Sequence, residues 1–475
     1  MEEYSQKAQL FGISEKFRFS QDYKHEIKTG EGYKLGGEGV QKTRGSEAWR
    51  DPEMWRGPQG GGATSSPVVL GSLLIFSSLD THVYGVDRNT GSLVWKFKAG
   101  DIIAGSVIVK DNIAFFGSQD GFVYALNAET GKLSWKYQTG GMVNAISGQF
   151  YKGNFYIGSS NGFMHCFSEK GDLLWKYKAG NAIFMSPAFV NDRLYFGSYD
   201  KHFYCLNTKG ELVWKFYVGE WVDNSPTVFS DGREIWSAFG EKKAYGGPAS
   251  VCFGAYTRNF YVLDCETGGL QWMRRMDGII SWSNPAVKDG KIYFGDWSGQ
   301  LYCLDAGSGA IDWKILTGGN IDTQPLIHEG YIYFGSYDGN LYAFSLEGKL
   351  SWKYQTGGVV ISRPVIENGV IYFGSMDTYM YAIDLETRKV LWKFITGAGK
   401  PAPIESMLKM IDQIKESQKI FSGWKPELIR PAYKDDRNLT FVAAPSEHAY
   451  ASQTPYKTDS PYQLQQKKKK QPWER

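Results

Sequence analysis

A motif of about forty residues returns eight times along this chain, and this repeat constrains the fold more than any other feature. Each copy closes on a tryptophan. These residues are Trp95, Trp135, Trp175, Trp214, Trp272, Trp313, Trp352 and Trp392. Their spacings are 40, 40, 39, 58, 41, 39 and 40 residues, so eight units fill residues 64–397. A chain of 475 residues is too long for one ordinary hydrophobic core, and growth by repetition accounts for its length.

Each unit has the pattern of four short strands. In the seventh unit, residues 331–334 and 341–344 are aromatic-rich strand candidates, joined by a turn at Asp338-Gly339 that accepts positive φ. Residues 350–353 form an outer strand, and a preceding strand completes the set of four. The sequence therefore predicts an all-β fold, an eight-bladed β-propeller of four-stranded antiparallel blades. An aromatic content of 16% and 56 glycines suit such short strands and tight turns.

The repeated tryptophans are interpreted as packing residues. A single blade cannot bury both of its faces, so we expect each tryptophan to fill the gap between neighbouring blades. Eight equivalent residues in a ring cannot all face one site, which argues against a cofactor role. The 58-residue spacing marks an insertion in the fifth unit, from Asp231 to Pro248, whose composition predicts a surface loop. Whether that loop carries function is left open by the sequence.

Charge and targeting signals point to a cytoplasmic protein. The formal net charge of +3 is too small to predict nucleic acid or an acidic membrane as the main partner. We find no secretory signal pattern and no apolar window long enough for membrane insertion. The five cysteines are odd in number and include no CxxC pair, which favours buried structural thiols. They are Cys166, Cys205, Cys252, Cys265 and Cys303.

The turn before each tryptophan carries a family resemblance. It reads Asp87-Arg88-Asn89-Thr90-Gly91 in the first unit and Asp264-Cys265-Glu266-Thr267-Gly268 in the fifth. The pattern resembles the pyrroloquinoline-quinone-like (PQQ-like) β-propeller repeat. The resemblance implies the propeller fold but does not fix an activity. The same repeat builds quinone-dependent alcohol dehydrogenases, an outer-membrane barrel-assembly lipoprotein that binds partners, and propellers attached to acyl-activating enzymes.

The dehydrogenase branch fits this chain poorly. Its members are expected to hold the quinone under a disulfide of adjacent cysteines, beside a calcium ion bound by Glu and Asn. This sequence has no Cys-Cys pair. Its six histidines are dispersed over separate units and tails, so no metal centre is predicted. We therefore expect a non-enzymatic protein of the non-dehydrogenase branch with no catalytic residues and no cofactor.

A polar funnel is the candidate ligand site. Asp223 and Asp322 stand at matching points of the fifth and seventh units, so both could face the central channel. The other funnel candidates are Asn144, Trp282, Asn284, Gln324 and Arg363. A solvated channel mouth without a ligand is the favoured interpretation, and a small ligand is not expected.

The two ends of the chain differ from the repeats. Residues 1–63 are an irregular N-terminal arm, and residues 398–475 form a C-terminal extension with one amphipathic helix predicted at 403–421. Beyond the helix, Tyr450, Tyr456 and Tyr462 are candidate partner anchors in an extended tail, with plain disorder as the alternative. The tail is similar in style to the arms of cytoskeletal and ciliary filament-associated proteins.

These observations predict a non-catalytic β-propeller scaffold. We expect it to bind other proteins in a multi-subunit assembly, through its terminal arms and its propeller rim, in the cytoplasm and with the cytoskeleton as a candidate setting. The alternative is a quinone-dependent oxidoreductase or a small-ligand sensor that uses the central funnel.

Overall fold

The computed structural model describes residues 61–143, 148–237, 240–241 and 248–397, together with the backbone of two short strands. These strands, β1 (Tyr33–Lys34) and β2 (Gln41–Lys42), pair antiparallel. The chain divides into two units, Met1–Trp424 and Lys425–Arg475, and every described residue belongs to the first. The predicted helix at 403–421 lies outside the described residues. Within the described part of the chain, no helix is long and apolar enough to cross a membrane.

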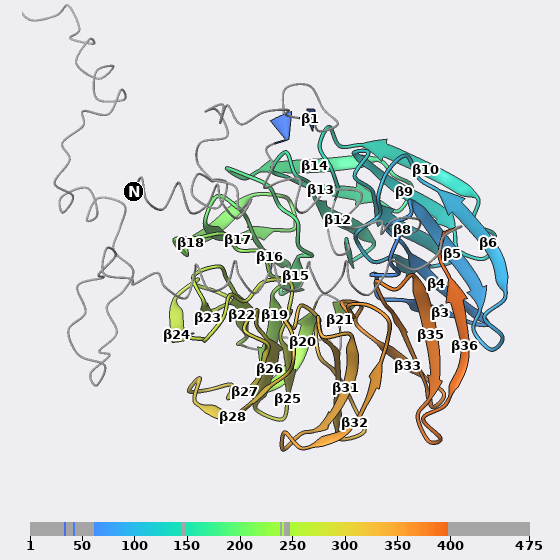
Figure 1. Ribbon diagram of the computed structural model, residues 1–475. Helices are drawn as coiled ribbons and strands as arrows, with labels where there is room; N and C mark the ends of the chain where they lie inside the picture. Colours follow the sequence, from blue (N-terminus) through green and yellow to red (C-terminus); the bar gives the residue numbers. More distant parts are fainter. Residues whose placement is uncertain are drawn as a thin grey trace, which may run out of the picture. The chain divides into compact units, whose positions relative to one another are not determined.

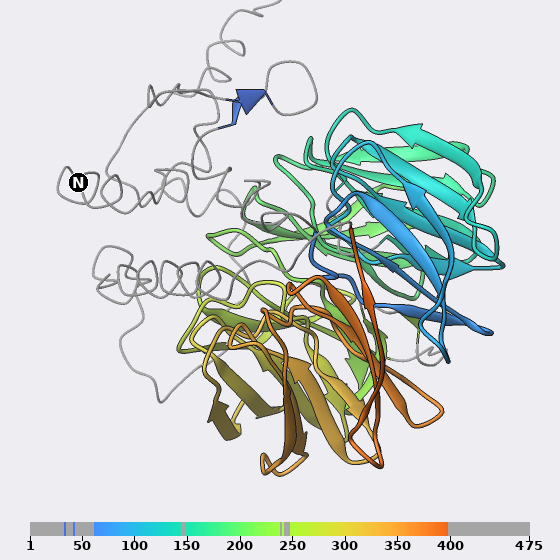
Figure 2. The same ribbon diagram turned by 45° about the vertical axis from the view of Figure 1, so that its right-hand side comes forward.

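Eight antiparallel sheets form the predicted propeller, and Figures 1 and 2 show them as a ring. The first four blades follow the chain in order. Blade 1 comprises β3 (Val68–Leu70), β4 (Leu73–Ser77), β5 (His82–Asp87) and β6 (Leu93–Lys98). Blade 2 comprises β7 (Ile108–Lys110), β8 (Ile113–Gly117), β9 (Phe122–Asn127) and β10 (Leu133–Gln138). Blade 3 comprises β11 (Gln149–Tyr151), β12 (Asn154–Gly158), β13 (Phe163–Ser168) and β14 (Leu173–Lys178). Blade 4 comprises β15 (Ala188–Val190), β16 (Arg193–Gly197), β17 (His202–Asn207) and β18 (Leu212–Tyr217).

The last four blades include the one with the insertion. Blade 5 comprises β19 (Thr227–Ser230), β20 (Arg233–Ser237), β21 (Gly240–Glu241), β22 (Ser250–Gly254), β23 (Asn259–Asp264) and β24 (Leu270–Arg275). Blade 6 comprises β25 (Ala286–Lys288), β26 (Lys291–Gly295), β27 (Gln300–Asp305) and β28 (Ile311–Leu316). Blade 7 comprises β29 (Leu326–His328), β30 (Tyr331–Gly335), β31 (Asn340–Ser345) and β32 (Leu350–Gln355). Blade 8 comprises β33 (Val365–Glu367), β34 (Val370–Gly374), β35 (Tyr379–Asp384) and β36 (Val390–Ile395).

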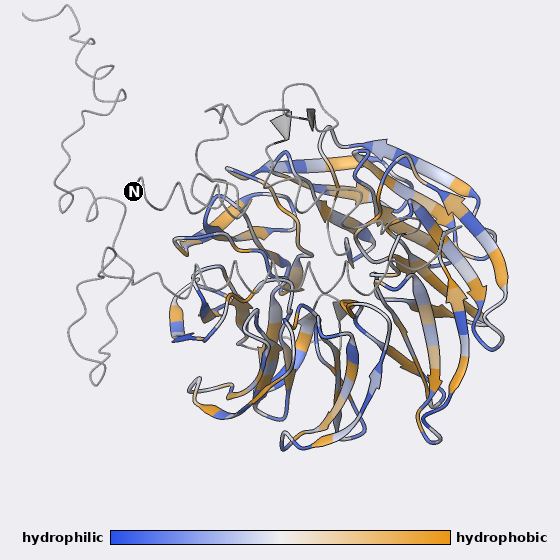
Figure 3. Cartoon of the chain, in the orientation of Figure 1, coloured by the Kyte–Doolittle hydropathy of each residue, from blue (hydrophilic) through white to orange (hydrophobic). Residues whose placement is uncertain are grey.

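The burial of each strand follows from its place in the blade. First strands of neighbouring blades contact one another, as β15 does with β19 and β25 with β29, so they surround the axis. Second and third strands are buried on both faces, whereas the fourth strand alternates between half-buried and exposed residues. Figure 3 accordingly shows hydrophilic and hydrophobic segments mixed along the outermost strands. The core is thus a series of layers between blades rather than one central mass.

The ring closes between blades 8 and 1. The amide of Ala63 donates to the carbonyl oxygen of Ser375 at 3.1 Å. The hydroxyl of Ser362 donates to the carbonyl oxygen of Ser65 at 2.9 Å. The residues just before the first blade thereby join the last blade. This non-covalent closure resists opening because the two ends of the repeat region are held by several such bonds at once.

The described part of the insertion in blade 5 forms strands rather than a surface loop, contrary to the sequence-based expectation; residues 238–239 and 242–247 lie outside the described residues. Its first part forms β20, which pairs antiparallel with β19 on the edge opposite β22, and the sheet order is β21-β20-β19-β22-β23-β24. Blade 5 therefore has six strands. β19 is one of the strands next to the axis, so the edge of β19 that does not pair with β22 faces the interior of the ring. β20 uses the backbone groups of this edge and contacts the first strands of blades 4 and 6.

The side chains of β20 explain why it stays inside the ring. Trp236 is 3% exposed, and its ring lies edge-on to Phe189, at 5.2 Å between centroids, and to Tyr151, at 5.6 Å. On the opposite side, the carboxylate of Glu234 accepts a hydrogen bond from the amide of Val287 at 3.3 Å. β20 therefore connects blades 3 and 4 with blade 6 across the axis.

Candidate functional site

The repeated tryptophans lie at the seams between blades. The Nε1 of Trp95 in blade 1 donates to the carbonyl oxygen of Ala128 in blade 2, at 3.1 Å. Equivalent bonds to the next blade are made by Trp135, Trp175, Trp214, Trp272, Trp313 and Trp392. Trp352 packs in a hydrophobic cluster with residues of blades 7 and 8. All eight tryptophans thus have packing contacts in the blades.

The motif turn that receives each tryptophan is built by its own polar residues. In blade 1, one carboxylate oxygen of Asp87 accepts hydrogen bonds from the amides of Asn89 and Thr90 and from the Thr90 hydroxyl. Hydrogen bonds from Thr90 hold the pKa of Asp87 below its usual value. In blade 2, Gly131 has φ +67, and a Cβ on it would lie 2.5 Å from the Trp95 ring. The turn therefore needs glycine for its backbone conformation and for the approach of the indole.

A second set of hydrogen bonds joins the segments that precede the first strands of neighbouring blades, and these bonds position the funnel residues. The side chain of Asn224 donates to the carbonyl oxygen of Ser283 at 2.9 Å. The Ser283 hydroxyl donates to the carbonyl oxygen of Thr323 at 3.1 Å. These residues lie at corresponding points of blades 5, 6 and 7. Asp223 and Asp322 immediately precede two of them. These hydrogen bonds therefore hold both carboxyl groups at the same end of the ring.

Asp223 is fully buried and its carboxyl group is hydrogen-bonded on one side. Its Oδ2 accepts bonds from the Tyr199 hydroxyl at 2.7 Å, the Trp282 Nε1 at 2.9 Å and the Ser281 hydroxyl at 3.4 Å. Trp282 reaches this position with φ +61. Burial raises the pKa of Asp223 from 3.8 to about 6, although the three donors lower it.

Asp322 is 7% exposed and has a similar environment. Burial raises its pKa from 3.8 to about 7, against the lowering effect of hydrogen bonds from Tyr337 and Trp297. The negative charges of Asp223 and Asp296 raise it further. The two funnel aspartates are therefore close enough for the charge of one to raise the pKa of the other.

Aromatic side chains surround these acids, and the sequence-based search did not identify most of them. One aromatic residue stands two positions after the end of β16, β22, β26 and β30, in blades 4 to 7. These residues are Tyr199, Tyr256, Trp297 and Tyr337. Trp221 stacks on Tyr199 at 4.6 Å, and Tyr256 contacts Trp221 at 5.3 Å and Trp297 at 5.7 Å. We call Tyr199, Trp221, Tyr256, Trp282, Trp297 and Tyr337 the aromatic wall.

The sequence did contain a signal for this wall. In the repeated Gly-Ser-x-Asp turn, the third position is Leu79 in blade 1 and Gln119 in blade 2, but aromatic in four consecutive blades. Side chains at that position meet at one end of the ring because the turns are equivalent. An aromatic run confined to neighbouring repeats therefore marks a local surface of the funnel.

Two of the remaining funnel candidates form hydrogen bonds between blades. Asn284 Oδ1 accepts a hydrogen bond from the Ser225 amide at 2.8 Å, and Gln324 Nε2 donates to the carbonyl oxygen of Pro285 at 3.2 Å. Both therefore join neighbouring blades. Burial lowers the pKa of Arg363 to about 10, while the charge of Glu234 on β20 raises it. Asn144 lies outside the described residues.

The residues of the funnel do not fit a calcium–quinone pair. Oδ2 of Asp223 is already engaged by three donors. In the described part of the chain, the funnel candidates have three buried side-chain oxygens that accept no hydrogen bond: Oδ1 of Asp223, Oδ1 of Asp322 and Oε1 of Gln324. Calcium takes six to eight oxygen ligands, and three oxygens fall short of that number. The five cysteines are buried and unpaired on separate elements. The funnel is better suited to an organic group that contacts aromatic rings.

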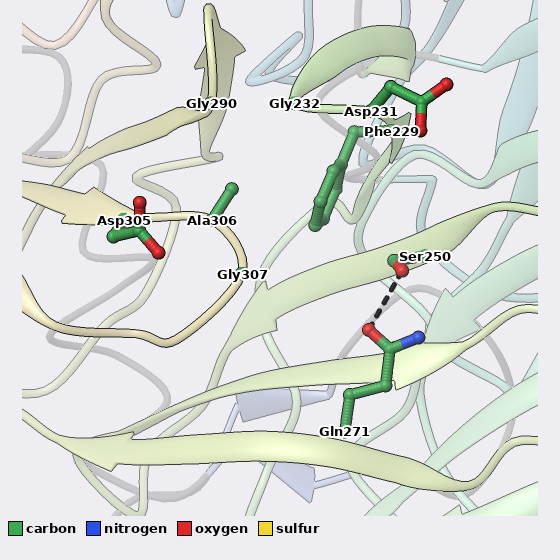
Figure 4. A pocket seen from close by; sticks show the side chains of 9 residues that line it. All are labelled: Phe229, Asp231, Gly232, Ser250, Gln271, Gly290, Asp305, Ala306 and Gly307. Atoms are coloured by element: carbon green, nitrogen blue, oxygen red, sulfur yellow. Dashed lines mark hydrogen bonds between the residues drawn. The ribbon is translucent and has the colours of Figure 1, made fainter.

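A concavity lies at the other end of β19. It has a volume of ≈ 350 Å³ and is lined by strand and turn residues of blades 5 and 6 (Figure 4). There the amide of Gly290 donates to the carbonyl oxygen of Gly232 at 2.9 Å, and the Ser250 hydroxyl donates to Gln271 Oε1 at 2.9 Å. Asp305 also lines it, and hydrogen bonds from Ser308 lower the pKa of this carboxyl group. Asp231 and Gly232, in the turn between β19 and β20, form part of its lining.

Solved structures similar to this chain share its fold. A computationally designed protein, Ika8, matches with a TM-score of 0.57 and 16% identity over 68% of this chain and 97% of its own. BamB from Moraxella catarrhalis matches with a TM-score of 0.53 and 18% identity over 67% and 96%. Quinohemoprotein alcohol dehydrogenase from Comamonas testosteroni matches with a TM-score of 0.56 and 14% identity over 72% and 75%. At these identities the likeness concerns the fold alone.

Family comparison gives a more specific result. No curated protein matches the chain. Residues 152–231 match the family model of the lambda-carrageenase β-propeller domain. Residues 38–182 and 231–407 match the family model described as outer membrane protein assembly factor BamB. Because this second match spans well over half of the sequence and follows the repeats seen in the structure, the chain belongs to this family of PQQ-like β-propeller repeat proteins.

Proposed function

We propose that this protein is a non-catalytic scaffold that joins a larger protein assembly through its propeller rim and its terminal arms. The family model that it matches is named for an assembly factor, which supports a role in binding proteins. The observation that carries the proposal is the apolar character of the rim in blades 4 to 6.

Outermost strands expose large apolar residues near their beginnings in several blades, such as Leu93, Leu133 and Leu350. In blades 4 to 6, and at Ile395 in blade 8, this exposure extends to the second half of the strand. Tyr217 is 64% exposed, Met273 54% and Leu316 69%. We call these three residues the rim patch. Strongly exposed apolar side chains on three consecutive blades favour contact with another protein.

The rim patch differs from the same part of the rim in blades 1 to 3. The last residue of the outermost strand is Lys98, Gln138 and Lys178 in those blades, and all three are exposed. The same position is Tyr217 in blade 4 and Leu316 in blade 6, whereas in blade 5 it is Arg275 and the exposed apolar residue, Met273, stands two positions earlier. Polar side chains there stay hydrated, whereas the apolar ones gain free energy when a partner covers them.

An extended protein segment is the partner that fits this surface. β18, β24 and β28 end their sheets, so their outer edges retain backbone groups that can pair with an added strand. Added strands derive affinity from main-chain hydrogen bonds and specificity from side-chain contacts. We propose that the partner contributes such a strand, with apolar side chains over the rim patch.

The test compares two triple variants. One replaces Tyr217, Met273 and Leu316 with serine, and the matched control replaces Lys98, Gln138 and Lys178 with serine. Co-purification from native extract with quantitative mass spectrometry measures the assembly. We expect the rim variant to lose its partners and the control to keep them. A strictly monomeric wild-type protein, or equal retention by both variants, would refute docking at the rim patch.

The terminal arms are the second part of the proposal. Tyr450, Tyr456 and Tyr462 lie outside the described residues and are proposed as anchors from the sequence alone. Deleting residues 1–48 and 422–475 should reduce the size of the assembly in size-exclusion chromatography. Replacing the three tyrosines with serine should have the same effect while the melting temperature of the propeller stays unchanged. Normal assembly by both variants would remove the arms from the proposal.

Ligand binding in the funnel is the second candidate function, favoured by the placement of Asp223 and Asp322 at one end of the ring. A quinone-dependent oxidoreductase is the enzymatic form of this candidate. The quinone and Ca²⁺, added together, should change the absorbance of the protein and support a dye-linked alcohol assay if that form is correct. We expect neither result, because the available oxygens do not suffice for calcium.

A further inference from the structure

We propose that the funnel of blades 5 to 7 binds a small organic cation, an alkylammonium group held against the aromatic wall by Asp223 and Asp322. This site is distinct from the rim and goes beyond the scaffold function. It rests on three features of the described residues: two buried carboxyl groups with an unused oxygen each, aromatic rings in front of them, and an aliphatic surface beside the rings.

The carboxyl groups are only partly satisfied. Oδ1 of Asp223 and Oδ1 of Asp322 are buried and, within the described part of the chain, accept no hydrogen bond. The charges that act on Asp322 from Asp223 and Asp296 are also negative. Burying a carboxylate without a compensating charge is costly. A bound cation would supply the missing charge to both groups.

The aromatic wall determines what kind of cation fits. Tyr199, Tyr256, Trp297 and Tyr337 are each partly exposed, whereas the carboxyl groups are buried. A ligand that enters the funnel therefore meets ring surfaces with negative charge close by. Alkylammonium groups bind to such rings through the electrostatic attraction between the cation and the aromatic face. A metal ion would instead require a full shell of oxygen ligands.

An aliphatic cluster continues the wall on one side. Leu79, Ile102, Val359 and Met376 form this cluster. Tyr337, which belongs to the wall, packs against it together with Ile361. The four residues of the cluster are themselves buried, so the partly exposed Tyr337 and Ile361 in front of them offer the apolar surface for the alkyl part of a ligand whose charged nitrogen lies at the aspartates. The combination selects a cation that is also apolar, and it disfavours both neutral polar molecules and hydrated inorganic ions.

The first experiment compares probes that differ in charge but not in shape. Tetramethylammonium is titrated into the full-length protein at pH 8, with isothermal calorimetry and tryptophan fluorescence as readouts. tert-Butanol is the neutral control of similar shape, and Ca²⁺ is the inorganic control. We expect tetramethylammonium to bind about tenfold or more tightly than tert-butanol. Equal binding of these two probes would overturn the proposal, as would tighter binding of Ca²⁺ or no binding of tetramethylammonium.

The second experiment assigns the binding to the aspartates. A double variant, Asp223→Asn with Asp322→Asn, keeps acceptors for the neighbouring donors but removes the charge. We expect about a tenfold or greater loss of tetramethylammonium affinity in this variant and no loss in Asp231→Asn, which lies at the other end of β19. Circular dichroism at the same pH verifies that the variants are folded. Unchanged affinity in a folded double variant would refute the site, whereas loss of rim-dependent assembly would concern only the scaffold proposal.

Discussion

The Nε1 of Trp392 donates a hydrogen bond to the carbonyl oxygen of Arg88 at 2.9 Å, across a sequence separation of 304 residues. The Tyr372 hydroxyl reaches the same oxygen at 3.4 Å. The seam between the last and first blades therefore uses the contact that joins consecutive blades elsewhere. A repeat that is continuous in sequence becomes a closed ring because its final tryptophan meets the first motif turn.

Loss of this contact should destabilise the whole ring. Trp392→Ala removes the indole from between blades 8 and 1, and we expect a decrease of about 3–5 kcal/mol in the free energy of unfolding, measured with urea. Trp392→Phe keeps an aromatic ring but loses the donor to Arg88, so its effect should be smaller. An unfolding free energy unchanged by the alanine variant would show that the seam does not stabilise the fold.

Alanine variants of two glycines distinguish the stability cost of backbone strain from the cost of a clash with a tryptophan ring. Gly131 has φ +67 and abuts the Trp95 ring, while Gly71 has φ +56 and no atom within 4 Å of an added Cβ. Gly71→Ala should cost about 1 kcal/mol from strain alone. Gly131→Ala should cost clearly more, because the indole must also move. Equal melting temperatures for the two variants would indicate that the indole moves at no cost.

β20 should contribute to stability as a core strand. Trp236→Ala removes the contacts with Phe189 and Tyr151, and the expected loss is about 3–5 kcal/mol of unfolding free energy. Arg233→Ala, at the exposed start of the same strand, is the control and should change stability by less than about 0.5 kcal/mol. If both variants unfold at the same urea concentration, β20 is only weakly attached to the ring.

The funnel acids should make stability depend on pH in a defined direction. The folded pKa of Asp322 is about 7, above its ordinary 3.8, so the folded protein holds this proton more tightly than the unfolded chain. The neighbouring titratable groups are Asp223, Asp296, Tyr256 and Tyr337. The stabilising contribution of the neutral carboxyl group is therefore fully present below about pH 4 and is lost as the pH rises through about 7.

Asp322→Asn tests that dependence because asparagine does not ionise. We expect the variant to exceed the wild type by about 2–4 kcal/mol in unfolding free energy at pH 8, with little difference at pH 4. Urea titrations at both pH values measure the difference between the two proteins and cancel the effect of other acids. A difference independent of pH would mean that Asp322 does not titrate in this range.

The sequence by itself determined the repetitive part of this protein. The number of blades, the order of strands within the seven regular blades and the turns at residues such as Gly339 follow from short-range patterns. Such patterns suffice because each strand pairs with its neighbour in the chain and each blade packs on the next repeat. The matching positions of Asp223 and Asp322 could also be located in this way, since equivalent residues of a repeat occupy equivalent places.

Only the tertiary structure decided what occupies the axis. The insertion was assigned to the surface from its composition, but the unpaired edge of β19 and the surrounding first strands bury Trp236. The aromatic wall likewise exists because turns of several blades converge at one end of the ring, where residues far apart in sequence become neighbours. Convergence at an axis depends on how the ring closes, and no local pattern of residues encodes that closure.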